Sequence, residues 1–485
     1  MRFKVIFNTT GIILKFISLI FILPVIFAYI YGDYKYVLGF VCAGVISLIL
    51  GFLFCLNDAS EKDIDNITRA EAFATVIFGW TMFGLCAAVP FLFFDLSVID
   101  SLFEAFSGVS TTGATILSDF SLYPKTFFIY RSVIQWFGGM GIIVLFIAVL
   151  PKFAVAGRQM FFAETPNPRE EKITPRIRHT ASWLWSIYIL MTIIQILILK
   201  FQGMDFYNAI CTSLSTISAG GFSNNPSGLV GVDSKFVWTV GIFSFIAGIN
   251  FLLTYKVLIK GKIAELFKSE EFRAYFLIVL FFTSILALIL YFQAHFSISD
   301  SIRNAFFETA ATITSTGIAS DDYMNWPIRA RVLLFVLMFI GGSAISASGS
   351  IKITRWIYVC KFIKKEMNKV AHPNAIYPIK LENRTVSPEI GYQIIVFIIF
   401  FMAIFALSSI IVSFIEQNVL IAVTGSIATL SNAGPGFDSV IGPLGSYGEL
   451  SGATKLIFMF NMVVGRLEII PFLALLQKDL WQFRK

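Results

Sequence analysis

Long apolar runs separated by short polar segments extend along almost the whole chain. Two runs, near residues 11–31 and 36–56, are each long enough to cross about 30 Å of hydrocarbon as a helix. After them one order of elements recurs four times: a long apolar helix, a short semi-apolar helix, a loop that ends on glycine, and a second long helix. The paired long helices are expected at 72–95 and 128–150, 182–200 and 236–258, 273–293 and 329–360, and 389–414 and 452–476. The pattern therefore predicts two leading spans and eight later ones.

The four loops are rich in small hydroxyl residues. They read Val109-Ser110-Thr111-Thr112-Gly113, Thr216-Ile217-Ser218-Ala219-Gly220, Ile313-Thr314-Ser315-Thr316-Gly317 and Leu430-Ser431-Asn432-Ala433-Gly434, and their glycines are 107, 97 and 117 residues apart. Such residues permit an extended backbone whose carbonyl groups all face one way, and four such strands around one axis can replace the water shell of a cation. The predicted cation ligands, mainly through backbone carbonyl oxygens, are Ser110, Thr111, Thr112, Gly113, Ile217, Ser218, Ala219, Gly220, Thr314, Ser315, Thr316, Gly317, Ser431, Asn432, Ala433 and Gly434.

The parity of the spans fixes how the loops are arranged. Each unit crosses the membrane twice, so every unit begins on the same side and all four loops enter from the same face, as parallel repeats do. A re-entrant loop at membrane depth is tolerated only where it is buried or lines a water-filled cavity. We therefore expect an all-α polytopic membrane protein with four helix–pore-helix–loop–helix repeats around a pseudo-four-fold pore. The expected divisions are 1–68 (two leading helices), 69–180, 181–268, 269–384 and 385–485 (the four repeats).

Composition and charge agree with a membrane protein. Hydrophobic residues make up 57% of the chain and charged ones 14%, whereas a soluble domain carries roughly a quarter. The net charge of +7 does not indicate nucleic acid as a partner, because the basic residues gather in connections between repeats. Lysines and arginines in short connections mark the cytoplasmic side. The segments 152–179 and 361–384 and both termini are thus expected in the cytoplasm, with the loops opening outward.

An enzyme is the alternative from another class, and the sequence disfavours it. The three histidines lie far apart, and no paired carboxylates, H-E-x-x-H motif or P-loop stands out. The five cysteines form no C-x-x-C pair, which argues against a zinc site or a disulfide framework.

A run of small residues interrupts the long helix expected at 329–360. Residues 341–350, Gly-Gly-Ser-Ala-Ile-Ser-Ala-Ser-Gly-Ser, favour local unwinding. Close packing between helices through small residues is the alternative, and both readings remain open at this point.

Charged residues at membrane depth need a reason. Arg466 lies within the last span, where an arginine costs about 2.5–3.5 kcal/mol on insertion scales, so it is expected to face the pore or a partner. A buried ion pair is the alternative. Glu104 and Glu308 precede the first and third loops. They either attract cations or anchor the loops by hydrogen bonds, and anchoring is the favoured interpretation.

The order and spacing of these features resemble a known family. Two leading helices and four repeats are similar to the membrane subunits of bacterial Trk-type potassium uptake systems, the TrkH/KtrB superfamily, and most like TrkH. The segments that carry the resemblance are Thr111-Thr112-Gly113-Ala114-Thr115, Ala219-Gly220-Gly221-Phe222-Ser223, Asn432-Ala433-Gly434-Pro435-Gly436, Gly465-Arg466-Leu467-Glu468 and Lys172-Ile173-Thr174-Pro175-Arg176.

The resemblance implies uptake of potassium, with rubidium as a surrogate, across the bacterial inner membrane. It also implies a gate beneath the filter, for which the matching residues are Gly341, Gly342, Ser346, Ser348, Gly349 and Arg466. In some plant members of this superfamily a serine in place of the first-repeat glycine accompanies sodium permeation, so retention of Gly113, Gly220, Gly317 and Gly434 implies selectivity for potassium. A sodium-permeable member of the superfamily is the alternative. The implied partners are a second copy of the chain, a cytosolic nucleotide-binding subunit of TrkA type, and membrane lipid.

Overall fold

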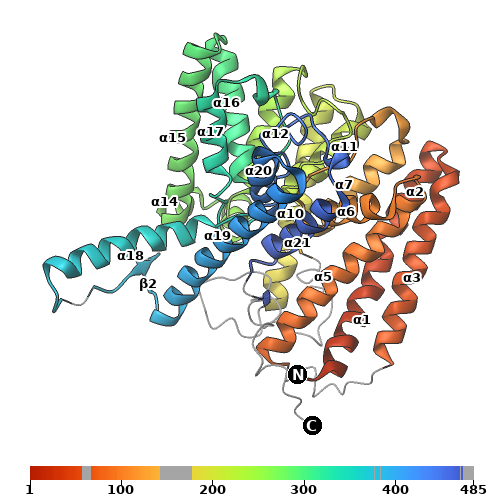
Figure 1. Cartoon of the computed structure of the whole chain (residues 1–485), viewed down its shortest axis with the longest axis horizontal. Coiled ribbons are helices and arrows are strands. Elements are labelled where there is room, and N and C mark those ends of the chain that lie inside the picture. The colour runs from red at the N-terminus through yellow and green to blue at the C-terminus, as the bar shows by residue number, and fades with distance from the viewer. Residues whose placement is uncertain (57–66, 142–176, 376, 383, 470, 473–485) are drawn as a thin grey trace.

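The computed structural model describes residues 1–56, 67–141, 177–375, 377–382, 384–469 and 471–472. Helices dominate the described part, and one short hairpin, Lys380–Leu381 paired with Arg384–Thr385, is the only sheet in it. The chain begins with α1 (Phe3–Ile20), α2 (Ile22–Tyr31) and α3 (Val37–Cys55). Figure 1 shows α1 and α3 at one edge of the helical bundle, with α18 (Ile353–Ala371) extending from the opposite edge.

Four repeats follow the leading helices. Their helices are α5 (Arg69–Leu92), α6 (Val98–Val109) and α7 (Lys125–Gly139); α10 (Ile177–Phe201), α11 (Phe206–Ile217), α12 (Ser234–Ala247), α13 (Phe251–Leu258) and α14 (Ile263–Lys268); α15 (Glu270–Gln293), α16 (Ile298–Ile313), α17 (Ile328–Leu337) and α18; and α19 (Pro388–Glu416), α20 (Val419–Leu430) and α21 (Gly452–Arg466). Short 3-10 turns lie at Tyr34–Tyr36, Phe120–Leu122, Tyr323–Asn325 and Tyr447–Glu449. The expected all-α polytopic architecture is confirmed.

The long first helices of the third and fourth repeats, α15 and α19, lie on the outside of the bundle, whereas α5 of the first repeat is mostly buried. In α15, 24 residues long, only Glu271, Phe272, Tyr275, Val279, Leu286 and Leu290 are buried. Large apolar side chains such as Leu277 and Phe281 remain more than half exposed. Lipid covers such a surface in a membrane protein, which explains the apolar composition.

The second helices differ from the sequence expectation. Within the described residues, six helices are long and apolar enough to cross a membrane, and seven if α12 and α13 count as one bent span. The second helices α7, α12, α17 and α21 have only 15, 14, 10 and 15 residues. Where α12 ends, the chain bends by 112° before α13. Sequence periodicity missed the break between α12 and α13 because the residues on either side remain apolar, whereas the interruption after α17 contains the predicted one at residues 341–350.

The short helices α6, α11, α16 and α20 are the predicted pore helices. Each begins with a polar cap, from Ser97, Asp205, Ser297 or Asn418, whose side chain accepts a backbone N–H of the first turn. Such caps satisfy donors that a helix leaves unpaired at its start. The carbonyl ends of these helices carry partial negative charge, and each leads into one of the glycine loops.

Candidate ion filter and gate

The four loops adopt one backbone conformation. Two residues past the end of its pore helix, each loop has a positive φ at a residue other than glycine. These angles are 56° at Thr111, 54° at Ala219, 58° at Ser315 and 56° at Asn432. Two residues later each loop has a glycine with positive φ, namely Gly113 (82°), Gly221 (82°), Gly317 (68°) and Gly434 (84°). L-residues seldom adopt this conformation, so the repetition marks four copies of one built element.

This register corrects the second loop by one residue. The residue that corresponds to Gly113 is Gly221, not Gly220, and the aligned segment is 218–221 rather than 217–220. The hydrogen bonds agree, since Gly220 N–H donates to Ser215 O at 2.9 Å just as Thr112 N–H donates to Ser107 O at 2.9 Å. Two adjacent glycines made the sequence alignment ambiguous, and Ile217 belongs to the pore helix.

The four loops close into a ring. A side chain at Gly113 would overlap the carbonyl oxygen of Gly220, and one at Gly221 would overlap that of Thr316. In the same way, Gly317 faces the carbonyl of Ala433, and Gly434 faces that of Thr112. Each repeat thus touches the next and the fourth returns to the first. Glycine is required at these positions both for the positive φ and for the close approach.

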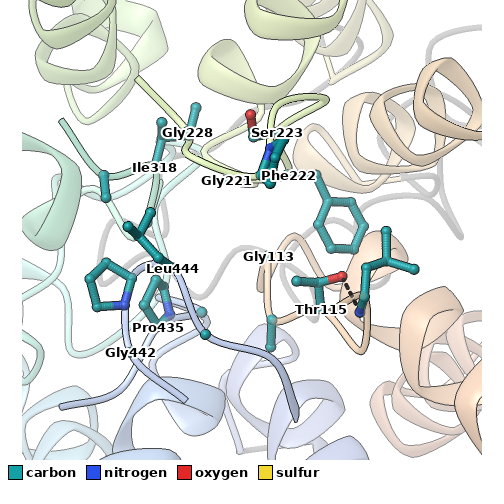
Figure 2. A pocket seen from close by; sticks show the side chains of 18 of the residues that line it. Gly113, Thr115, Gly221, Phe222, Ser223, Gly228, Ile318, Pro435, Gly442 and Leu444 are labelled. Carbon is teal, nitrogen blue, oxygen red and sulfur yellow. Dashed lines mark hydrogen bonds between the residues drawn. The ribbon is translucent and has the colours of Figure 1, made fainter. Parts of the chain in front are cut away.

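Outside the ring lies a hollow of about 650 Å³, including the part that is open to solvent. All four ring glycines line it, as do Arg131 and Tyr447. Figure 2 shows Gly113, Gly221, Ile318 and Pro435 around this hollow, one from each loop. Asp119 lies between two lining residues, and the hydroxyl and backbone N–H of Ser121 lower the pKa of its carboxyl.

Below the glycines the loops present oxygen atoms. Thr111 Oγ1, Ser431 Oγ and Asn432 Oδ1 are buried and have no hydrogen-bond partner among the described residues. The hydroxyls of Ser110 and Thr112 lie 2.7 Å apart. Hard monovalent and divalent cations take oxygen ligands of this kind, including backbone carbonyls.

Glu104 and Glu308 occupy equivalent places behind the first and third loops. Each lies nine residues before its ring glycine. Glu104 accepts the N–H of Ile116 at 3.1 Å, and Glu308 accepts the N–H of Ser320 at 2.7 Å. Both acceptors are buried. These hydrogen bonds are those of loop anchors.

Polar residues of α7 also hold the loops, and the sequence did not single them out. Gln135 donates to Gly220 O at 2.5 Å and accepts from Phe222 N–H at 3.2 Å. Arg131 contacts both the first and second loops. The sequence signal that could have found them is the presence of two polar residues within an apolar helix, since buried polar groups need hydrogen-bond partners.

Residues 341–350 lie directly beneath the ring. The chain is not helical between Leu337 and Ile353, so the small residues serve an unwound segment and not helix packing. Gly349 N–H donates to Ser315 Oγ at 2.7 Å, and a side chain at Gly349 would overlap Ser431 O. The segment thus touches two of the four loops.

The break between α12 and α13 supports the same segment. Ser343 N–H donates to Gly248 O at 2.9 Å, and Phe251 N–H donates to Ile345 O at 3.1 Å. Glu271, at the start of α15, accepts the N–H of Ala344 at 2.5 Å. The unwound part of the third repeat therefore pairs with the unwound part of the second.

Arg466 ends α21 and reaches the segment from the other side. Its guanidinium donates to Ala347 O at 2.9 Å, and to Gly138 O and Gly139 O at 2.8 and 2.7 Å. Glu468 pairs with Arg355. The chain beyond Arg466 takes positive φ at Glu468 and Ile469, so the described helix ends well before the expected boundary at 476. Lys352 adds a second buried cation, whose ammonium contacts Ser348.

Known proteins share this architecture. The family model described as "TrkH: Cation transport protein" matches residues 38–482. The Trk system potassium uptake protein TrkH of Escherichia coli (strain K12) is 34% identical over 99% of this chain and 100% of its own length. The TrkH protein of Vibrio parahaemolyticus is 32% identical over 99% of this chain and 100% of its own length.

A solved structure agrees with the sequence comparison. The crystal structure of the potassium transporter TrkH from Vibrio parahaemolyticus superposes with a TM-score of 0.89 at 29% identity, covering 99% of this chain and 100% of that one. The chain therefore belongs to the TrkH family of cation transport proteins, whose members are transporters and not enzymes.

Proposed function

We propose that this protein carries potassium across the bacterial inner membrane through the ring of four loops. Its potassium ligands are the backbone carbonyls of residues 110–113, 218–221, 314–317 and 431–434. The observation that carries the proposal is the ring itself, in which each positive-φ glycine presses against the carbonyl of the next repeat. The relatives' names, Trk system potassium uptake proteins, support potassium as the cation.

The proposed selectivity follows from the close contact between each ring glycine and the carbonyl oxygen of the neighbouring repeat. Carbonyl dipoles replace the hydration shell of an ion when their number and spacing suit it. A side chain at any ring glycine would displace a neighbouring carbonyl, and the cage would lose a ligand. Potassium is then no longer preferred to sodium.

The segment 341–350 and Arg466 form the gate in this proposal. The segment contacts the underside of two loops, and Arg466 holds it to the end of α7. The positive charge of Arg466 opposes the passage of cations, so that conduction requires both to move.

Orientation and partners complete the proposal. Both termini and the basic connections are cytoplasmic, and the hollow opens outward. By resemblance to the family, the chain forms a homodimer and docks a cytosolic nucleotide-binding subunit of TrkA type.

Rubidium flux into liposomes tests the proposal, with potassium and sodium as competitors. Wild type is compared with Gly113→Ser, and Gly231→Ser is the matched control. Gly231 has a similar φ of 75° but no atom close to where a side chain would lie. Flux blocked by potassium and barely by sodium, with sodium leakage only in Gly113→Ser, supports the filter. Equal block of the wild type by both ions would instead assign the chain to the sodium-permeable alternative.

A further inference from the structure

Arg131 is buried within α7, and its contacts all lie around the first two loops. The side chain is 1% exposed. Its Nε donates to Glu104 Oε1 at 2.6 Å, and one terminal nitrogen donates to Thr115 Oγ1 at 2.9 Å. The other donates to Ser223 O at 3.0 Å, and the guanidinium lies 3.9 Å from the centre of the Phe222 ring. Burial of an arginine at membrane depth is costly and marks a site with a function.

These contacts join two neighbouring loops immediately outside the glycine ring. Thr115 comes two residues after Gly113, and Phe222 and Ser223 follow Gly221 directly. Figure 2 shows Thr115 and Phe222 on adjacent loops at the wall of the hollow. One rigid guanidinium therefore spans the first and second repeats, which the planar fork of an arginine can do and a single ammonium cannot.

A comparison with the third repeat shows what Arg131 adds to the anchoring of a single loop. Glu308 accepts the N–H and hydroxyl of Ser320, as Glu104 accepts from Ile116 and Thr115. Among the described residues, however, no basic side chain forms an ion pair with Glu308. A carboxylate thus anchors its own loop without an arginine, and the contacts to Phe222 and Ser223 are what Arg131 adds.

We propose that Arg131 is a positioning residue for selectivity, which holds the first two loops at the spacing that suits potassium. The inference rests on the proposed function of the ring. A dehydrated sodium ion is smaller, so its coordination requires the carbonyls to move inward. The guanidinium, fixed by three hydrogen bonds and stacked on Phe222, resists that movement between these two loops. Its hydrogen bonds are to Glu104 and to the two loops, so it acts through the loops.

Two variants test the bridge and keep its charge. Arg131→Lys retains a cation beside Glu104 but cannot reach both loops. Thr115→Val removes, at nearly constant volume, a hydroxyl that accepts from Arg131 and from Leu117 N–H and donates to Glu104. The preference is measured by how strongly potassium and sodium each compete with rubidium flux. We expect either variant to reduce the preference for potassium by about tenfold, which corresponds to the loss of one charge-assisted hydrogen bond. Elution on gel filtration should match that of the wild type, which shows that the variants fold. Substitution of a residue that only stabilises the fold would not change the ratio of inhibition by potassium to inhibition by sodium.

Matched controls are available in the same chain. Arg303→Lys alters an arginine that is paired with Asp300 and hydrogen-bonded to Ser234 and Asn304, away from the ring. Thr126→Val removes a hydroxyl that donates to a carboxylate, that of Asp33, also away from it. Both should keep the wild-type preference.

The outcomes separate this inference from the proposed function. If wild type prefers potassium and both Arg131→Lys and Thr115→Val keep that preference, the positioning role is overturned while the filter stands. If wild type shows no preference, the proposed function fails first and the inference fails with it. Loss of preference in the two variants with both controls intact supports the bridge.

Discussion

Arg466, the last residue of α21, donates to the carbonyl oxygen of Ala347 in the unwound segment of the third repeat. The same guanidinium donates to the carbonyls of Gly138 and Gly139 at the end of α7. One side chain thus links the first, third and fourth repeats directly beneath the glycine ring. In the proposed gate, a path below the ring opens only when these hydrogen bonds break or move together.

Arg466→Ala should raise basal rubidium flux. The substitution removes a positive charge from the proposed ion path and the hydrogen bond that holds Ala347. Each hydrogen bond to a charged group contributes about 1.5–3 kcal/mol, so a flux increase of about tenfold is expected. Flux into liposomes without any cytosolic partner measures it, with Arg329→Ala, an exposed arginine of α17, as control. Unchanged or lower flux in a well-folded variant would count against the gate.

Gly221→Ala should damage transport far more than Gly220→Ala. Gly221 has a φ of 82° and faces the carbonyl of Thr316, which is backbone and cannot move aside. Gly220 corresponds to Thr112 of the first loop, and a methyl there meets only the end of the Gln135 side chain.

The comparison of rubidium uptake by these two variants tests the register of the second loop. The opposite ranking of the two glycines would return the register to the one read from the sequence.

Glu271→Ala should loosen the segment that lies beneath the ring. Its carboxylate accepts the N–H of Ala344 and, at 3.2 Å, the hydroxyl of Thr354, and it is buried. A buried donor left without a partner costs about 1–3 kcal/mol, so we expect a lower melting temperature in detergent together with higher basal rubidium flux. Glu389→Ala, at an exposed position of α19, is the control. A fall in melting temperature with unaltered flux would show that Glu271 stabilises the fold and does not restrain the segment.

Lys455 and Asp100 should stabilise the junction between the fourth and first repeats. The ammonium of Lys455, 6% exposed, lies 2.6 Å from the carboxylate of Asp100. Removal of one partner of a buried pair costs up to about 3–5 kcal/mol. Because Asp100 is a quarter exposed, we expect Lys455→Met to lower the free energy of unfolding by about 2 kcal/mol.

A double-mutant cycle with Asp100→Asn measures this interaction through thermal unfolding of the purified protein. The double variant should lose less than the sum of the two single variants, because neither charge remains buried alone. Strict additivity would mean that the pair does not contribute to closing the ring.

The apolar runs and the hydroxyl–glycine loops were readable from the sequence because each depends on residues close together in the chain. A run of about 20 apolar residues crosses a membrane whatever its neighbours are. A glycine after small hydroxyl residues predicts a loop in the same local way. The four-fold plan, the pore helices and the interruption at residues 341–350 all followed from such local patterns and their repetition.

Tertiary structure decided the rest. The choice between Gly220 and Gly221 rests on the side chain of Gln135 and the backbone carbonyl of Thr316, both far away in sequence. The break after α12 matters because it pairs with the segment after Leu337. The partners of Arg131 and Arg466 lie up to 92 and 328 residues away. A sequence pattern shows that a buried charge needs a partner, but only the folded chain brings that partner within hydrogen-bond distance.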